Sequence, residues 1–165
     1  MSEKILIGYE SATGTTKEVA ETISVSLVNE GYDVLVTTIS EIKEMATYDH
    51  ILLASPINGM SWLEGPKTFL LNNASVLKDK DVVLIYVSYI LKTGNGFWRK
   101  TILKGMKKLA GPINVTRIQG FGGQVTAPFG TVPRMIFGIS KTASPDARDL
   151  DEVIRFTKDL VKSWQ

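Results

Sequence analysis

The sequence predicts an α/β domain in which a five-stranded parallel sheet lies between two layers of helices. Stretches of strand length and stretches with helical spacing of apolar residues alternate along the 165 residues. The strand segments are almost continuously apolar, which is typical of parallel strands buried on both faces. A loop rich in hydroxyl side chains separates the first strand from the first helix. These observations indicate one doubly wound, three-layer domain spanning residues 1–165.

The expected strands and helices alternate along the whole chain. We expect strands over residues 5–9, 33–39, 51–55, 82–88 and 115–121. We expect helices over residues 15–30, 40–46 (short), a stretch around Pro66 that includes 69–71, 97–110 and 150–164. Gly31 suits the C-terminal end of the first helix, Pro66 suits the first turn of its helix, and Gly111-Pro112 suits the end of the fourth.

The first and last helices are predicted to bury one face each. The first is expected to bury Val19, Ala20, Ile23, Leu27 and Val28. In the last, one stripe comprises Leu150, Val153, Ile154, Thr157, Leu160, Val161 and Trp164. Acidic residues near its start and Lys158 and Lys162 near its end complement the helix dipole.

Composition excludes several kinds of chemistry. The chain has no cysteine, so disulfides, thiolate metal sites and cysteine nucleophiles are excluded, and redox chemistry would need a bound cofactor. His50, the only histidine, has no neighbouring ligand pattern, so we predict neither a metal site nor a catalytic triad. The net charge is +2 with basic residues scattered, so we expect no nucleic-acid partner. No apolar run approaches a membrane span and no secretory signal is recognised, so we expect a cytoplasmic protein.

The segment between the first strand and the first helix has the features of a phosphate site. It reads Ser11-Ala12-Thr13-Gly14-Thr15-Thr16. Small side chains permit close approach, hydroxyls donate hydrogen bonds, and the helix N-terminus supplies unpaired N–H groups. No Lys follows the glycine, so a triphosphate-binding loop of the Walker type is excluded. The alternative is a polar turn in which a Thr caps the helix.

This loop resembles the phosphate loop of flavodoxins and related flavin mononucleotide (FMN) proteins, which it matches position by position from Ser11 to Thr16. The resemblance implies FMN as cofactor and a flavodoxin-like fold with strand order 2-1-3-4-5, as in flavodoxin itself, with the flavin between strands 1 and 3. Response regulators share the topology, but they need paired acids after strand 1 and an Asp ending strand 3. This chain has Glu10-Ser11 and Ser55 there.

The loops after strands 3 and 4 are predicted to flank the flavin ring. The first contributes Pro56, Ile57, Asn58, Gly59 and Trp62, with Met60 beside them, and the second contributes Ser88, Tyr89 and Gly94. By resemblance to flavodoxins, the peptide at Gly59 reorients when the flavin is reduced. Alternatively, Gly59 forms a plain turn and Trp62 packs on its own loop.

Two features differ from typical flavodoxins. The chain is basic and lacks the acidic residue near the second ring loop, so we expect a higher potential for the last electron and a different docking surface. The connection from Gly122 to Ser144 is long and apolar. Together with Phe121-Gly122-Gly123 and Ala54-Ser55-Pro56-Ile57, it resembles the flavodoxin-type, menaquinone-linked protoporphyrinogen dehydrogenases. Its residues 125–140 are interpreted either as a lid or a contact for a quinone, a porphyrin or a membrane, or as a small helix packed on the core.

Two functional hypotheses follow. In the first, the chain is an FMN-binding redox protein that passes electrons to a partner protein or to a small acceptor such as a quinone. In the second, it is a quinone-linked oxidoreductase of the protoporphyrinogen dehydrogenase type, with its own organic substrate. The basic charge and the apolar connection favour the enzyme, whereas the lack of an acid–base residue in the loops favours the carrier. A fold that has lost its flavin and serves as a binding module is the third alternative.

Overall fold

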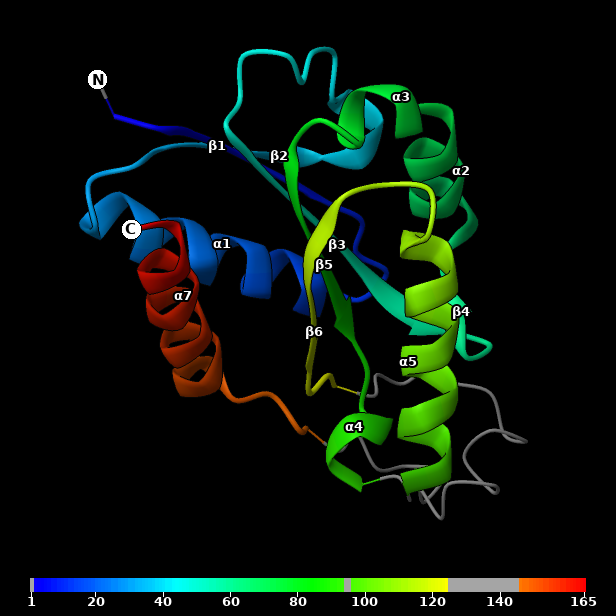
Figure 1. Cartoon of the computed structure of the whole chain (residues 1–165). Helices are drawn as coiled ribbons and strands as arrows, with labels where there is room; N and C mark the ends of the chain where they lie inside the picture. Colours follow the sequence, from blue (N-terminus) through cyan, green and yellow to red (C-terminus); the bar gives the residue numbers. More distant parts are fainter. Residues whose placement is uncertain (1, 94–95, 125–145) are drawn as a thin grey trace.

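The computed structural model describes residues 2–93, 96–124 and 146–165. A parallel sheet lies between two helical layers (Figure 1). The strands are β1 (Lys4–Tyr9), β2 (Asp33–Thr38), β3 (His50–Asn58), β4 (Ser61–Trp62), β5 (Asp81–Val87) and β6 (Val115–Phe121). The helices are α1 (Thr15–Asn29), η1 (a 3-10 turn, Ile39–Glu41), α2 (Glu64–Asn72), α3 (Ala74–Leu77), α4 (Ile90–Thr93), α5 (Gly96–Ala110) and α7 (Leu150–Trp164).

The order of the main strands is β2-β1-β3-β5-β6, and all four neighbouring pairs are parallel. This confirms the predicted order 2-1-3-4-5, since β5 and β6 are the fourth and fifth long strands. The short β4 adds an antiparallel pair to the end of β3, with Ile57 opposite Trp62. The first strand therefore lies between the second and third, where the chain reverses its direction of winding.

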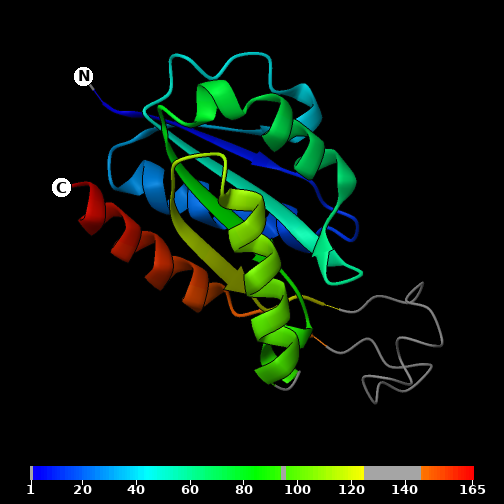
Figure 2. The ribbon, with the colours of Figure 1, turned by 45° about the vertical axis from the view of Figure 1, so that its right-hand side comes forward.

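The two faces of the sheet carry separate cores because side chains alternate along each strand. Ile5 and Ile7 pack with the buried faces of α1 and α7, while Leu6 packs on the other side with α2, α3 and α5. Figure 2 shows α1 and α7 together on one side of the sheet and the green helices on the other. The sheet is thus covered on both faces, as its apolar strands predict.

The ends of α1 and α5 agree with the turn residues in the sequence. Gly31 adopts a left-handed backbone with φ of 93° after α1. Its N–H donates to the Val28 carbonyl at 3.0 Å, and the Tyr32 N–H donates to the Leu27 carbonyl at 3.1 Å, which closes the helix end in a Schellman motif. Helix α5 ends at Ala110, directly before Gly111-Pro112.

Several predicted details were wrong. Residues 40–46 do not form an α-helix, because only the three-residue turn η1 is present at their start. The third strand does not stop at Ser55 but continues to Asn58, since its last residues pair with β4. Val28 is 54% exposed rather than buried. The short elements α3, α4 and β4 were not predicted because two to four residues are too few to show a period.

Candidate functional site

Three loops lie along the carboxyl edge of the sheet, where β1, β3 and β5 end (Figures 1 and 2). They are the connection from β1 to α1, the hairpin formed by β3 and β4, and the connection from β5 to α4. The Glu10 N–H donates to the Ala54 carbonyl at 2.9 Å, which ties the first loop to β3. In open α/β sheets this edge, beside the reversal of strand order, is the usual ligand position.

The loop after β1 is held in a defined shape by its own side chains. The Gly14 N–H donates to Ser11 Oγ at 2.9 Å. Because Ser11 Oγ accepts this bond, its own O–H remains able to donate to a ligand. The hydroxyls of Thr13 and Thr15 lie 3.5 Å apart.

The first turn of α1 is open. Gly14, the residue before the helix, has a left-handed backbone with φ of 92° and no side chain that could cap the first turn of α1. A Cβ added at Gly14 would have no atom within 4 Å, so the loop borders open space. Thr15 and Thr16 are buried at 5% and 1% exposure. The free N–H groups, the dipole and the hydroxyls together suit an anion.

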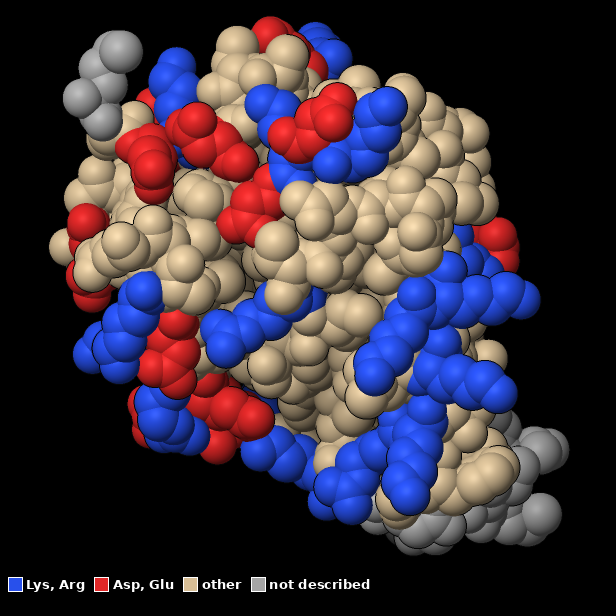
Figure 3. Space-filling model, viewed as in Figure 1, with Lys and Arg blue, Asp and Glu red and all other residues tan. Residues whose placement is uncertain are grey.

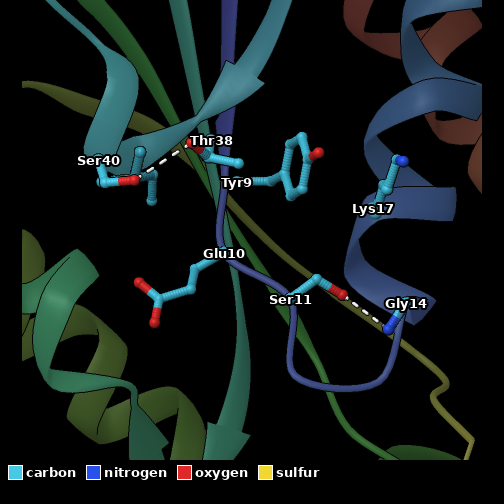
Figure 4. Close-up of a pocket in the computed structure, with 8 residues that line it drawn as sticks. Tyr9, Glu10, Ser11, Gly14, Lys17, Thr38 and Ser40 are labelled. Atoms are coloured by element: carbon cyan, nitrogen blue, oxygen red, sulfur yellow. Dashed lines mark hydrogen bonds between the residues drawn. The ribbon is translucent and has the colours of Figure 1, made fainter.

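A hollow of about 530 Å³ lies beside this loop (Figure 4). It is lined by Tyr9, Glu10, Ser11, Gly14, Lys17, Thr38, Ile39 and Ser40. The hollow therefore opens between the ends of β1 and β2. Lys17, Thr38 and Ser40 were not predicted for this site, because they lie outside the loops after strands 1, 3 and 4.

Two carboxylates near the start of α1, those of Glu18 and Asp146, are paired with Arg148. Arg148 Nη1 donates to Glu18 Oε2 at 2.8 Å. The same guanidinium binds Asp146, with Nε 2.9 Å from each carboxylate oxygen, and these hydrogen bonds hold the pKa of Asp146 below its ordinary value. The Glu10 carboxylate points toward α2, where a Cβ on Gly65 would lie 2.7 Å from its Oε2. Glu18 is thus paired with a cation, whereas Glu10 lines the hollow beside the loop.

The second loop is a tight hairpin. Gly59 and Met60 connect β3 to β4 with φ of 57° and 67°, the two positive values that a type I′ turn requires. Met60 is the one non-glycine residue among the described parts of the chain with positive φ. Ile57 and Met60 are half-buried, and Asn58 and Gly59 are exposed. The hairpin base is fixed by the Leu63 N–H, which donates to Ser55 Oγ at 3.3 Å.

The third loop packs against the start of the connection from β6 to α7. The Ser88 N–H donates to the Phe121 carbonyl at 2.9 Å. Gly123 packs closely, since a Cβ there would lie 3.1 Å from Val87 Cγ1. Gln124 forms an antiparallel bridge with Asp146, and the Ala147 N–H donates to the Gly123 carbonyl at 3.1 Å. The two flanks of the segment 125–145 therefore meet beside Ser88 and Tyr89.

A family model described as a flavodoxin domain matches residues 6–149. The chain belongs to the flavodoxin domain family. No curated protein matches it in sequence. The matched family is described at the level of the flavodoxin domain, so the narrower resemblance to protoporphyrinogen dehydrogenases gains no support from it.

Solved flavodoxin structures have the same fold. An archaeal flavodoxin is 18% identical, with a TM-score of 0.62 over 97% of each chain. Oxidised flavodoxin 1 from Bacillus cereus is 14% identical, with a TM-score of 0.64 over 97% of this chain and 98% of that one. A flavoprotein from Lactobacillus acidophilus, solved in complex with FMN, is 18% identical with a TM-score of 0.54 over 73% of this chain and 93% of its own.

The flavodoxin domain places the predicted site residues in different environments. Ser11–Thr16 form the loop before and into α1, Pro56–Gly59 belong to the hairpin, and Ser88 and Tyr89 follow β5. Among these residues, Ser11 and Gly14 line the hollow beside the loop, whereas those after β3 and β5 do not. Gly94 lies outside the described residues. So do residues 125–140, for which a lid, a membrane contact or a small helix was considered.

The expected ring contact from Trp62 needs correction. Its side chain is 1% exposed and belongs to the core cluster on the α5 side of the sheet. The cause is the hairpin, since pairing with Ile57 places Trp62 in a strand rather than in a free loop. Trp62 is therefore assigned to the core.

His50 lies at the opposite edge of the sheet from these loops. Its Nδ1 is 2.7 Å from Asp81 Oδ2, and the Trp164 Nε1–H donates to the same oxygen at 2.7 Å. The His50 ring stacks on Trp164 with centroids 3.9 Å apart. These contacts attach the end of α7 to β3 and β5, which is a structural role. Within the described stretches, no helix combines the length and apolarity needed to cross a bilayer.

Proposed function

We propose that this flavodoxin domain binds FMN non-covalently and transfers electrons through it. The observation that carries the proposal is the open first turn of α1, where left-handed Gly14 leaves the first N–H groups without a side-chain cap. A dianionic phosphate is the group that such a helix start favours. Membership of the flavodoxin domain family and the flavodoxin fold support the same cofactor.

The residues of the first loop fit a phosphate by their chemistry. Ser11 and Thr13 are accessible and offer O–H donors, and the Gly14 backbone permits close approach because it carries no side chain. Lys17 lines the adjoining hollow and adds a positive charge. Arg148 pairs with Glu18, which reduces the repulsion between this acid and a bound phosphate.

For the ring of the flavin we propose the hairpin after β3 and the loop after β5. Half-buried Ile57 and Met60 offer apolar contact, and exposed Asn58 and Gly59 offer backbone hydrogen-bonding groups. Tyr89 is a half-buried aromatic side chain in the second of these loops. The bound flavin supplies the electron chemistry, and the protein residues bind it, orient it and limit its contact with water.

The quinone-linked oxidoreductase is the second candidate. It depends on the connection between Gly122 and Ser144, most of which lies outside the described residues. The carrier is favoured because the described loop residues offer hydrogen-bond donors and apolar contacts for a flavin, without a positioned acid–base pair for an organic substrate. We also propose that the electron acceptor is a partner protein or a small molecule such as a quinone, and that the protein works in the cytoplasm.

Titration of the purified chain with FMN, followed by flavin absorption and fluorescence, tests the proposal. We expect saturable binding that weakens about tenfold when Ser11→Ala and Thr13→Ala remove two accessible hydroxyl donors. Thr22→Ala is the matched control, because it removes a hydroxyl from the same helix about two turns beyond Thr15. Failure of the wild-type chain to bind FMN, with its fold intact by circular dichroism, would disprove the proposal and favour the binding-module hypothesis.

A further inference from the structure

Helix α5 presents a face of one charge. Its outer surface carries the exposed Lys100, Lys104, Lys107 and Lys108, and Arg99 is exposed near the start of the helix. The helix has no Asp or Glu. None of the five cations belongs to an ion pair among the described residues, and the sequence of residues 94–95 and 125–145 contains no Asp or Glu.

Figure 3 shows this distribution on the molecule. Lys and Arg side chains gather where Figure 1 draws α5, and no acidic side chain interrupts them. Elsewhere on the same face, basic and acidic side chains are mixed. The modest net charge of +2 therefore conceals a local concentration of positive charge.

The helix holds these cations in fixed positions. Ile102 and Met106 are 1% and 2% exposed and pack into the core on this side of the sheet. Because the apolar stripe is anchored, the lysines from Lys100 to Lys108 are directed outward along about two turns of the helix. A surface of one sign attracts a surface of the other sign and speeds its association.

We propose that the outer face of α5 docks an acidic patch on a partner protein. The face begins at the carboxyl edge of the sheet, where α5 starts at Gly96, and extends toward the opposite edge. Phe97, which is 65% exposed, gives its first turn an apolar contact of the kind that anchors interfaces. A partner aligned along α5 is thereby held beside the proposed flavin site. The docking itself does not depend on FMN binding.

An acidic protein suits this face better than a bilayer does. A helix that lies in a membrane interface turns its apolar side to the lipid. The apolar side of α5 is covered by the sheet, with Ile102 and Met106 facing the core. Phe97 is the exposed large apolar residue of the helix. The outer face of α5 therefore complements the charge of an acidic protein, and it has few apolar side chains that could insert into a bilayer.

The test uses the isotopically labelled full chain titrated with a short oligo-glutamate peptide and followed by NMR amide shifts. We expect shifts that concentrate on α5 and binding that weakens steeply with added salt. The variant Lys100→Gln, Lys104→Gln, Lys107→Gln should bind about tenfold more weakly. Its matched control, Lys43→Gln, Lys158→Gln, Lys162→Gln, removes the same charge from exposed positions elsewhere and should bind as the wild type does. FMN titration of both variants tests the flavin proposal independently.

Three outcomes would overturn the proposal. The first is an absence of α5 shifts at low salt, and the second is equal weakening by the two triple variants. The third is preferential binding, lost in the α5 variant, to vesicles of phosphatidylcholine and phosphatidylglycerol or to oligothymidylate. That result would assign the face to a membrane or a nucleic acid.

Discussion

The first turns of α1 and α7 both have N–H groups without a partner inside the helix, but only α7 is capped by the side chain of the residue before it. At α7, Asp149 accepts from the Glu152 N–H at 2.9 Å, and Asp151 and Glu152 add negative charge to the first turn. At α1, Gly14 provides no side chain, and Glu18 is engaged by Arg148. A helix start that the chain caps itself contributes stability, whereas one left open with donors around it is available to a ligand.

The largest expected effect comes from placing a carboxylate at the open helix start. Gly14→Asp should weaken FMN binding about 100-fold, because the new charge would repel the phosphate at short range. Gly31→Asp is the matched control, since Gly31 has nearly the same positive φ, 93°, and also borders open space, but at the other end of α1. Equal FMN affinity in the two variants, measured by fluorescence titration, would contradict the assignment of Gly14 to the phosphate.

Removing the capping carboxylate at the start of α7 should lower stability without changing FMN affinity. Asp149→Ala removes the cap of the Glu152 N–H and should lower the free energy of unfolding by about 1 kcal/mol. Asp149→Asn keeps an acceptor oxygen and should recover most of the loss. Urea unfolding measures both. FMN affinity should stay unchanged in both variants, and a parallel loss of affinity would show that the two helix starts are not independent.

The smallest effect concerns Arg148, which links the two regions. Arg148→Gln breaks contacts to Glu18 and Asp146 that are partly exposed to solvent, so we expect a loss of about 0.5 kcal/mol at neutral pH. Because Arg148 lowers the pKa of Asp146 in the folded state, this contribution is present above about pH 4 and declines as the pH falls through the lowered value. Urea unfolding of wild type and variant from pH 7 to pH 2.5 should show their difference shrinking. A constant difference would mean that Asp146 does not contribute.

The limits of β2, α1, α5 and α7 were predicted closely from the sequence because they depend on local patterns, and the strand order followed from the resemblance of the Ser11–Thr16 loop to flavodoxins. Continuous apolar runs mark buried strands, Gly31 ends α1 through its left-handed backbone, and Gly111-Pro112 follows the end of α5. The hairpin after β3 was not predicted. Its two-residue strand has no period of its own, and pairing with Ile57 is what directs Trp62 into the core.

For the candidate site, the sequence by itself determined the loop from Ser11 to Thr16, since hydroxyls, glycine and the following helix are adjacent in the chain. Tertiary structure decided what surrounds that loop. Arg148 reaches Glu18 across 130 positions, and Thr38 and Ser40 line the hollow from the end of β2. It also decided that the lysines of α5 form one outward face, because burial of Ile102 and Met106 fixes the rotation of the helix. The chemistry of a single loop depends on residues that are adjacent in the sequence. Charge pairing and solvent exposure depend on distances that are set only when the chain packs.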